Sequence, residues 1–381
     1  MRQAITPWGN SGGFSFPRIL PSVAPIILVA PAAFKGTLGP RQVAEAIATG
    51  VRRAVPGALV LECPVADGGN GLLDVVLPAG ALRERLPVTG PIGESVSAEL
   101  GWIDGETAII ESASACGLAL VEPEDRDPMR TTTRGVGELI WTAADRGAKT
   151  IVVGLGGTAT VDGGTGAARG FGWTFENAGG EQLPDGGGSL VDLASFRSGW
   201  GLGARVVALA DVATPLLGPD GAAPVFGPQK GARPEEIPLL VAGLTRLAEL
   251  WTQAGRPGLG TQSMGGAAGG LGAGLAFFAK AELTRGADWV LERAGFDAAL
   301  AKADLVITAE GVFDKTSLVG KAPGEVVRRA QVAKKKVAVV AGRVEGVIGV
   351  HAVGGDGDGR FLDAAALAQM AEQVAREALR L

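Results

Sequence analysis

Residues 26–71 read IILVAPAAFKGTLGPRQVAEAIATGVRRAVPGALVLECPVADGGNG. The pattern predicts a buried strand at 26–30, an amphipathic helix at about 40–55 with proline in its first turn, and a second strand at 59–64. A glycine-rich loop at 66–71 follows the second strand. In open α/β sheets such loops lie at the edge where ligands bind, so this stretch predicts an α/β fold with its site at the strand ends.

The chain beyond residue 80 first changes its pattern and then returns to the α/β rhythm. Short apolar or alternating runs at 83–88, 95–102 and 107–111 indicate strands of a hairpin or a mixed sheet. Further helices are expected at 135–146, 166–172, 235–254, 273–281, 324–333 and 364–379. Further strands are expected at 150–154, 205–210, 303–308 and 337–340, with a loop at 310–321.

The two ends of the chain share one pattern, which predicts that they build one domain together. We expect that domain to comprise residues 24–85 and 285–381, with a second, mixed α/β domain inserted at 86–284. The cleft between two such domains is a natural ligand site. Residues 1–23 are interrupted by prolines and glycines, so we expect a loose extension there and not a signal peptide.

The residue inventory excludes whole classes of chemistry. The 381 residues carry a net charge of -5, and 46% of them are hydrophobic, which is typical of a globular protein. His351 is the only histidine, there is no tyrosine, and the only cysteines are Cys63 and Cys116. Serine-histidine triads and zinc cages are therefore disfavoured, proton transfer falls to Asp, Glu or Lys, and a metal would be an oxygen-liking ion such as Mg²⁺.

Charge and hydropathy also limit the partners. No dense basic stretch exceeds Lys334-Lys335-Lys336, so no nucleic-acid partner is expected, and no apolar run is long enough for a membrane span. Two cysteines far apart in the sequence do not suggest a disulfide-dependent secreted fold. The sequence favours a cytoplasmic location.

Six glycine-bearing segments with charged residues adjoin apolar strands. They are Phe34-Lys35-Gly36, Ala66-Asp67-Gly68-Gly69, Val161-Asp162-Gly163-Gly164, Phe226-Gly227-Pro228-Gln229-Lys230-Gly231, Glu310-Gly311-Val312-Phe313-Asp314 and Gly320-Lys321-Ala322-Pro323. Glycine loops expose backbone N–H groups to phosphate, lysines neutralise it, and carboxylates hold Mg²⁺ or accept a proton. A single Asp-Gly-Gly is more often only a turn, but the set favours phosphoryl transfer. Neither a P-loop nor a Gly-x-Gly-x-x-Gly motif is present.

The segments, taken in order, resemble the bacterial glycerate kinase family, a two-domain type unrelated to P-loop kinases. The resemblance covers residues 26–345 and also includes Gly154-Leu155-Gly156-Gly157-Thr158-Ala159, Pro215-Leu216-Leu217-Gly218, Gly269-Gly270-Leu271-Gly272-Ala273 and Asp304-Leu305-Val306-Ile307-Thr308. It implies a flavodoxin-like parallel-sheet domain, built from both chain ends, into which the second domain is inserted. It also implies Mg²⁺-dependent transfer of the ATP γ-phosphate to D-glycerate, usually at the 2-hydroxyl.

The resemblance implies roles for particular residues. The expected catalytic residues are Lys35, Asp67, Asp162 and Asp314. The expected substrate- or nucleotide-binding residues are Gly68, Gly69, Gly156, Gly157, Thr158, Lys230, Glu310 and Lys321. Asp67 and Asp211 are the expected metal ligands. The oligomeric state, a homodimer among the options, stays open.

The chain departs from the family pattern at several polar loop positions. Ala32 and Asn70 replace acidic residues, and Val312 replaces an arginine. Val161, Thr214 and Thr316 are further departures. Loss of these groups leaves two alternatives open, which are a catalytically weakened pseudokinase that binds ligand without turnover and a kinase for a different hydroxyacid or a neutral polyol.

Overall fold

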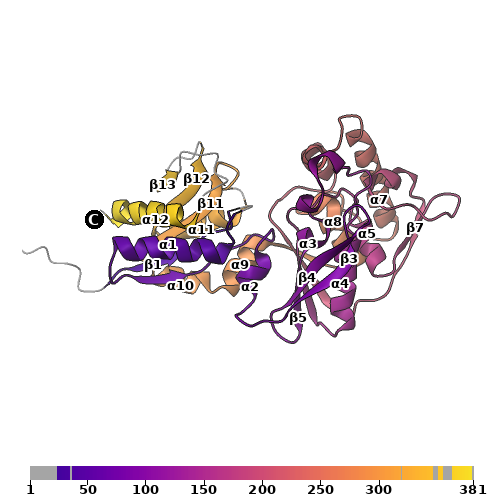
Figure 1. Ribbon diagram of the computed structural model, residues 1–381. Helices are drawn as coiled ribbons and strands as arrows, with labels where there is room; N and C mark the ends of the chain where they lie inside the picture. Colours follow the sequence, from indigo (N-terminus) through magenta and orange to yellow (C-terminus); the bar gives the residue numbers. More distant parts are fainter. Residues whose placement is uncertain (1–23, 35–36, 319, 346–350, 355–362, 380–381) are drawn as a thin grey trace, which may run out of the picture.

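The computed structural model describes residues 24–34, 37–318, 320–345, 351–354 and 363–379, and it consists of two α/β domains (Figure 1). The first domain contains a fully parallel sheet in the order β13-β12-β11-β1-β2. Its strands are β1 (Ile26–Val29), β2 (Leu59–Glu62), β11 (Leu305–Phe313), β12 (Lys336–Val344) and β13 (His351–Gly354). Strands from both chain ends lie in this one sheet, where β1 pairs with β11, which confirms that the two ends build one domain.

Helices cover both faces of the first sheet. On one face, α1 (Pro40–Ala54) and α12 (Ala364–Leu379) pack against each other and against β1 and β11. A Cβ at Gly50 of α1 would lie 1.9 Å from the Ala368 carbonyl oxygen, so only glycine permits this approach. On the other face lie α9 (Gly286–Arg293), α10 (Phe296–Lys302) and α11 (Ala322–Val332).

The second domain contains a mixed sheet in the order β10-β9-β6-β5-β4-β3. Its strands are β3 (Arg83–Thr89), β4 (Ser95–Trp102), β5 (Thr107–Glu111), β6 (Thr150–Gly154), β9 (Arg205–Ala210) and β10 (Glu282–Arg285). The pairs β3-β4 and β4-β5 are antiparallel and the others are parallel. A separate small sheet pairs β7 (Thr174–Glu176) with β8 (Ser195–Arg197).

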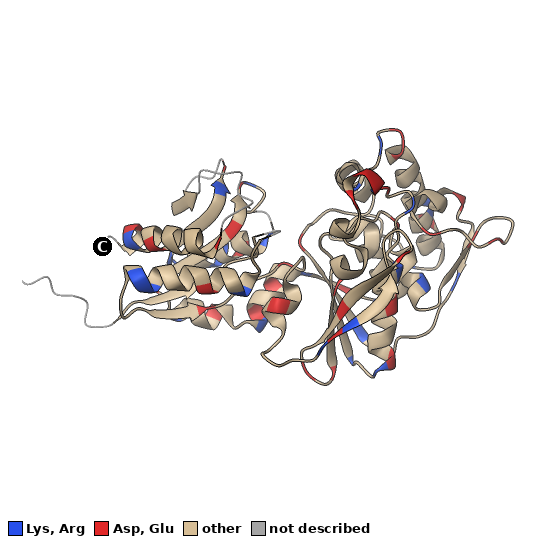
Figure 2. Cartoon of the chain, in the orientation of Figure 1, with Lys and Arg blue, Asp and Glu red and all other residues tan. Residues whose placement is uncertain are grey.

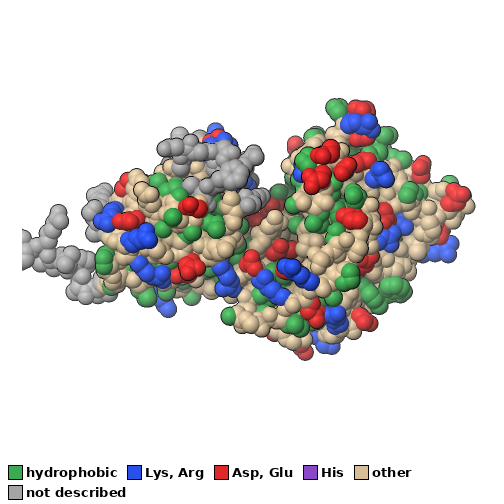
Figure 3. Space-filling model, in the orientation of Figure 1, with side chains coloured by type: hydrophobic (Ala, Val, Ile, Leu, Met, Phe, Trp, Pro, Cys, Tyr) green, Lys and Arg blue, Asp and Glu red, His purple; other side chains and the backbone are tan. Residues whose placement is uncertain are grey.

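The helices between residues 72 and 278 complete the second domain and its joint with the first. They are α2 (Leu72–Val76), α3 (Ser112–Cys116), α4 (Arg134–Asp145), α5 (Thr165–Gly170), α6 (Ala222–Phe226), α7 (Ile237–Gln253) and α8 (Leu271–Phe278). Side chains of α2 and α9 pack on one face of the mixed sheet, against residues that include Ile109, Val152 and Leu209. The two domains are thus joined by a shared apolar cluster, and the face drawn in Figure 3 is hollowed where they meet.

Two expectations about secondary structure were wrong. The loop expected from Glu310 begins later, because β11 stays paired with β12 through Phe313. The helix expected to reach residue 281 ends at Phe278, because Glu282–Arg285 pairs with β9. The strands β7, β8, β10 and β13 were not anticipated, since they are short and carry little apolar periodicity.

The predicted domain boundaries remain predictions. The expected division at residues 85 and 86 falls inside β3, so we propose that the inserted domain begins at Arg83. Figure 2 shows acidic and basic residues interspersed over both domains. No helix within the described ranges is long and apolar enough to cross a membrane.

Candidate active site

The loop that carries Asp67 lies where the carboxyl ends of strands from both sheets meet. It follows β2, and its Gly68 carbonyl accepts a hydrogen bond from Gly156 N, 3.2 Å away, beyond the end of β6. Gly68 has a φ of +97°, and a Cβ there would lie 2.6 Å from the Leu209 carbonyl oxygen of β9. A Cβ at Gly286 would lie 2.0 Å from the Asp67 carbonyl oxygen. Close backbone contacts on several sides therefore fix the position of Asp67.

Glu310 brings a buried carboxyl group to the same place. It lies near the end of β11, its side chain is buried, and its Oε1 has no hydrogen-bond partner among the described residues. The pKa of Glu310 is raised to about 7: burial is the largest cause and the charges of Asp67 and Asp314 add to it, whereas the Ser317 hydroxyl and the Lys321 ammonium oppose it. Because the charges of Asp67, Asp314 and Lys321 all act on the pKa of Glu310, these four side chains lie near one another in the structure.

Asp314 differs from Glu310 because its carboxylate is already hydrogen-bonded. Its Oδ1 accepts hydrogen bonds from Thr316 N at 2.7 Å, from Thr316 Oγ1 at 2.6 Å and from Ser317 N at 3.1 Å. The hydrogen bond from the Thr316 hydroxyl is the largest of the effects that lower the pKa of Asp314. Asp314 therefore orders the turn after β11, and Thr316, one of the departures from the family pattern, takes part in that turn.

Lys321 and Asp211 face this region from different domains. Lys321 is the residue that precedes the first turn of α11, so it lies at the positive end of an 11-residue helix. A Cβ at the neighbouring Gly320 would lie 3.1 Å from the Asp211 carbonyl oxygen, just after β9. The loop of the first domain that carries Lys321 and the loop of the second domain that carries Asp211 are therefore adjacent.

The loop after β6 packs directly on the Asp67 loop. A Cβ at Gly156 would lie 2.4 Å from the Gly69 Cα, and a Cβ at Gly157 would lie 3.2 Å from the Asn70 side-chain oxygen. The buried Lys230 supports this loop, since its Nζ donates hydrogen bonds to Thr158 Oγ1 at 3.0 Å and to the Thr160 carbonyl at 2.8 Å. Burial lowers the pKa of Lys230 to about 8. Lys230 and the Thr158 hydroxyl thus contact each other inside the protein.

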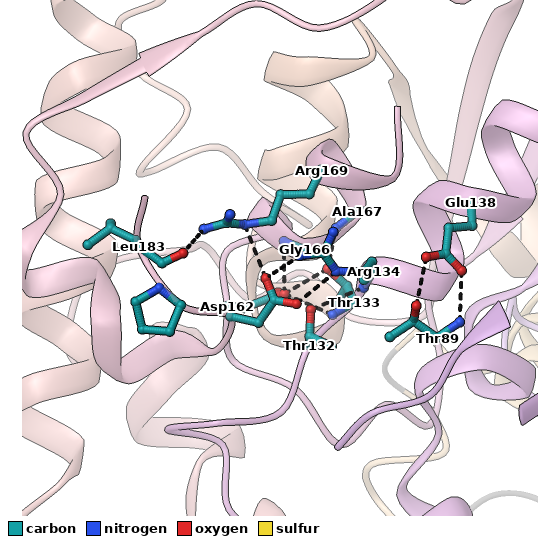
Figure 4. Close-up of polar contacts among 12 residues, drawn as sticks. Thr89, Thr132, Thr133, Arg134, Glu138, Asp162, Gly166, Ala167, Arg169 and Leu183 are labelled. Atoms are coloured by element: carbon teal, nitrogen blue, oxygen red, sulfur yellow. Dashed lines mark hydrogen bonds and ion pairs between the residues drawn. The ribbon is translucent and has the colours of Figure 1, made fainter. Parts of the chain in front are cut away.

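Asp162 is completely buried, and Figure 4 shows its carboxylate directed at Thr133 and Gly166. Its Oδ2 accepts hydrogen bonds from Thr133 N at 2.9 Å, Thr133 Oγ1 at 2.8 Å and Gly166 N at 3.2 Å. Its Oδ1 accepts a hydrogen bond from Gly164 N at 3.0 Å. Burial raises the pKa of Asp162, and these hydrogen bonds oppose the rise. Asp162 therefore joins the starts of α4 and α5.

The structure thus divides the residues singled out in the sequence. Asp67, Glu310, Asp314 and Lys321 converge at the joint, with the glycine loops at 68–69 and 156–157 beside them. Asp162 and Lys230 are buried and hydrogen-bonded to the protein itself, and Lys35 lies outside the described residues. The resemblance offered Glu310 both as a ligand-binding residue and among the carboxylates for metal or base roles, and the continuation of its buried strand past Glu310 was not anticipated.

The carboxylates at the joint do not form a closed metal cage. Within the described part of the chain, no three His, Cys, Asp or Glu side chains lie close enough together to hold a metal ion. A cation at this place would need ligands from a substrate or from water, which is the ordinary coordination of Mg²⁺ beside phosphates.

Comparisons with known proteins agree on one family. Residues 27–378 match the profile described as "Glycerate kinase family". The glycerate kinase of Bacillus subtilis (strain 168) is 42% identical over 325 residues, which are 84% of this chain and 85% of that protein. The glycerate 2-kinase of Escherichia coli (strain K12) is 41% identical over 331 residues, which are 85% and 87% of the two chains.

A solved structure is similar along nearly the whole chain. It is a crystal structure from Salmonella typhimurium LT2, assigned as glycerate kinase 2, with 38% sequence identity and a TM-score of 0.79. The match covers 93% of this chain and 98% of that one. The resemblance in sequence therefore extends to the arrangement of both domains.

Proposed function

Because the chain belongs to the glycerate kinase family, we propose that it transfers the γ-phosphate of ATP to the 2-hydroxyl of D-glycerate, giving 2-phosphoglycerate and ADP. The relatives named as glycerate kinases support the acceptor, and the one named as a glycerate 2-kinase supports the position. The observation that carries the proposal is the convergence of Glu310, Asp67, Asp314 and Lys321 at the meeting point of the two domains.

We assign the role of general base to Glu310. Its pKa of about 7 lies near neutral pH, where a carboxylate accepts a proton effectively, and its Oε1 has no partner among the described residues. The proton of the glycerate hydroxyl moves to this carboxylate as the hydroxyl oxygen bonds to the γ-phosphorus. The bond between the γ-phosphorus and its bridging oxygen breaks, and ADP leaves. Asp314 has a lowered pKa and is the weaker base.

The cationic and glycine-rich segments would hold the phosphates. Lys321 lies at the N-terminal end of α11, where both its ammonium and the helix dipole favour an anion. The backbone N–H groups of Gly68 and Gly157 are the further donors in this proposal, because those of Gly69 and Gly156 already donate hydrogen bonds to the protein. Lys230 and Asp162 act beneath these loops as positioning residues, because their polar atoms are bonded to the protein.

The carboxylates at the joint fit Mg²⁺ bound together with ATP. Mg²⁺ takes one or two protein carboxylates and completes its shell with phosphate oxygens and water, so the absence of a three-residue cluster within the described ranges is compatible with it. We propose Asp67 and Asp211 as its ligands, one from each domain. The bound cation would neutralise charge on the transferring phosphoryl group.

A substrate comparison tests the proposed function. With Mg²⁺ and ATP, we expect ADP release with D-glycerate at a rate well above that with L-glycerate or glycerol. Preference for glycerol would contradict the proposed acceptor and favour a polyol kinase. Binding of ATP and glycerate by calorimetry without any ADP release would identify a pseudokinase and contradict the proposed activity.

The pH dependence provides a test of Glu310 as the base. Because the carboxylate form accepts the proton, kcat/KM for D-glycerate is expected to rise with pH and to level off above a pKa of about 7. In Glu310→Gln this rise with pH, the acidic limb of the profile, should disappear, and kcat should fall by about 10²- to 10⁴-fold. Steady-state rates between pH 5.5 and 9 measure both effects.

Stability measurements give an independent reading of the same group. Since folding raises the pKa of Glu310, the buried carboxylate lowers the free energy of unfolding progressively between the ordinary pKa of 4.5 and about 7. Glu310→Gln should therefore become more stable relative to the unchanged protein as the pH rises from 4.5 to 8. Glu111→Gln is the control for activity, because Glu111 is a half-buried carboxyl whose pKa is also raised by burial; its variant should keep the rise in kcat/KM near pH 7. Loss of that limb in Glu111→Gln, or its survival in Glu310→Gln, would refute the assignment.

A further inference from the structure

Arg343 lies at the carboxyl edge of the first sheet, beside the strand that carries Glu310. The residues of β12 from Ala338 to Gly342 are buried, and Arg343, which follows them, is exposed. Its register partner on the parallel strand β11 is Val312. Register partners on neighbouring parallel strands lie about 4.8 Å apart and point to the same side of the sheet. The side chains of Arg343 and Val312 are therefore direct neighbours.

Val312 is the position at which the family pattern has an arginine. Valine cannot bind a carboxylate, yet the proposed acceptor, glycerate, carries one. The neighbouring strand places a guanidinium group at the same level along the sheet. Because an arginine side chain is long enough to extend across one strand, Arg343 can reach the space over Val312. A guanidinium group is thus present at this edge of the sheet, one strand away from Val312.

The present partner of Arg343 is one that a ligand could replace. Its Nε lies 2.9 Å from Glu345 Oε1, and the two side chains are 46% and 54% exposed. An ion pair this exposed to water contributes little to stability, so exchange of the Glu345 carboxylate for a substrate carboxylate is inexpensive. A guanidinium group also binds a carboxylate through two parallel hydrogen bonds, which a lysine cannot do.

We propose that Arg343 binds the carboxylate of glycerate and takes the place of the arginine missing at Val312. This inference rests on the proposed function, since it assigns the acceptor subsite of the same reaction. With Arg343 in this role, Lys321, which lies near Glu310, remains available to bind the phosphates. The assignment also explains how the site could recognise a carboxylate although Val312 replaces an arginine.

Kinetics of three variants test the proposal. In Arg343→Ala the KM for D-glycerate is expected to rise about 10- to 100-fold, while the KM for ATP and the kcat at saturating glycerate change less than about twofold. Arg343→Lys should keep part of the affinity. Adding Val312→Arg to Arg343→Ala should restore the KM to within a few fold, because the guanidinium returns to the adjacent register position.

The control is Arg52→Ala, which removes another exposed arginine that pairs with a glutamate, Glu62, at 2.9 Å in the same domain. Its KM values should be unchanged, and thermal unfolding should show that all variants are folded. An unchanged KM for glycerate in Arg343→Ala would overturn this inference and leave the proposed function standing.

If the unchanged protein does not phosphorylate glycerate, the proposed function is wrong. Calorimetry with D-glycerate then tests, without any turnover, whether Arg343 binds the carboxylate. Weaker glycerate binding in Arg343→Ala, restored by Val312→Arg, would support the subsite. Equal binding in the unchanged protein and in Arg343→Ala would overturn it.

Discussion

Asp67→Asn is expected to lower kcat/KM for D-glycerate by about 10³-fold or more without unfolding the protein. The substitution preserves the shape of the side chain, and the hydrogen bond from Gly69 N to Oδ1, 3.3 Å in the structure, can persist. It removes the negative charge at the place where both domains meet and where we expect Mg²⁺ and the phosphates. The loss should appear mainly in kcat, and steady-state assays at several Mg²⁺ concentrations measure it.

Asp74→Asn is the matched control for this prediction. Asp74 lies on α2, in the segment that follows the Asp67 loop, and it forms an exposed ion pair with Arg83 at 2.8 Å. Its variant should retain activity within about twofold, because exposed ion pairs contribute little. Activity of Asp67→Asn within tenfold of the unchanged protein would contradict the proposed role of the Asp67 carboxylate.

Asp162→Ala is expected to have the largest effect on stability, a loss of about 3–5 kcal/mol in the free energy of unfolding. The substitution removes the acceptor from three backbone N–H groups and from the Thr133 hydroxyl, all in the interior. Each buried donor left without an acceptor costs about 1–3 kcal/mol, although neighbouring groups relax and the costs do not add fully. Urea unfolding followed by circular dichroism measures the change.

Asp185→Ala serves as the comparison, since Asp185 forms partly exposed ion pairs with Arg134 at 2.8 Å and with Arg169 at 3.1 Å near the same helix start. Its variant should lose clearly less stability than Asp162→Ala, because the Asp185 and Arg134 side chains are partly open to water. If Asp162 positions the loop without touching substrate, the folded fraction of Asp162→Ala should keep the KM for glycerate within a few fold. A stability loss below about 1 kcal/mol would show that the hydrogen bonds of Asp162 are not important for folding.

Local patterns in the sequence were sufficient for the main features of the fold. The apolar runs near residues 26 and 305 have the length of buried strands, and the glycine loops after them mark the carboxyl edge. The similar rhythm at both chain ends indicated one domain, which the pairing of β1 with β11 in the first sheet confirms. These features depend on contacts between residues close in sequence, or on periodicity, and both are visible in a single chain.

Features that depend on distant contacts could not be predicted. The continuation of β11 past Gly311 depends on its pairing with β12, and β10 is a polar segment that becomes a strand only beside β9. An Asp-Gly-Gly segment looks the same whether its carboxylate faces a ligand or the backbone. Asp67 and Asp162 share that motif, and only the position of Thr133 shows that the Asp162 carboxylate is hydrogen-bonded within the protein. The pKa of Glu310 depends on burial and on Asp67, far away in the sequence.

Phosphorus NMR of the reaction with D-glycerate tests the central claim most directly, because it identifies both the transfer and the hydroxyl that receives the phosphoryl group. The unchanged protein with Mg²⁺ and ATP should produce 2-phosphoglycerate in equal amount to ADP, and Asp67→Asn should produce almost none. Formation of 3-phosphoglycerate would contradict the proposed position of transfer. Release of inorganic phosphate alone, or unchanged ATP, would contradict the account of this site as a glycerate-phosphorylating centre.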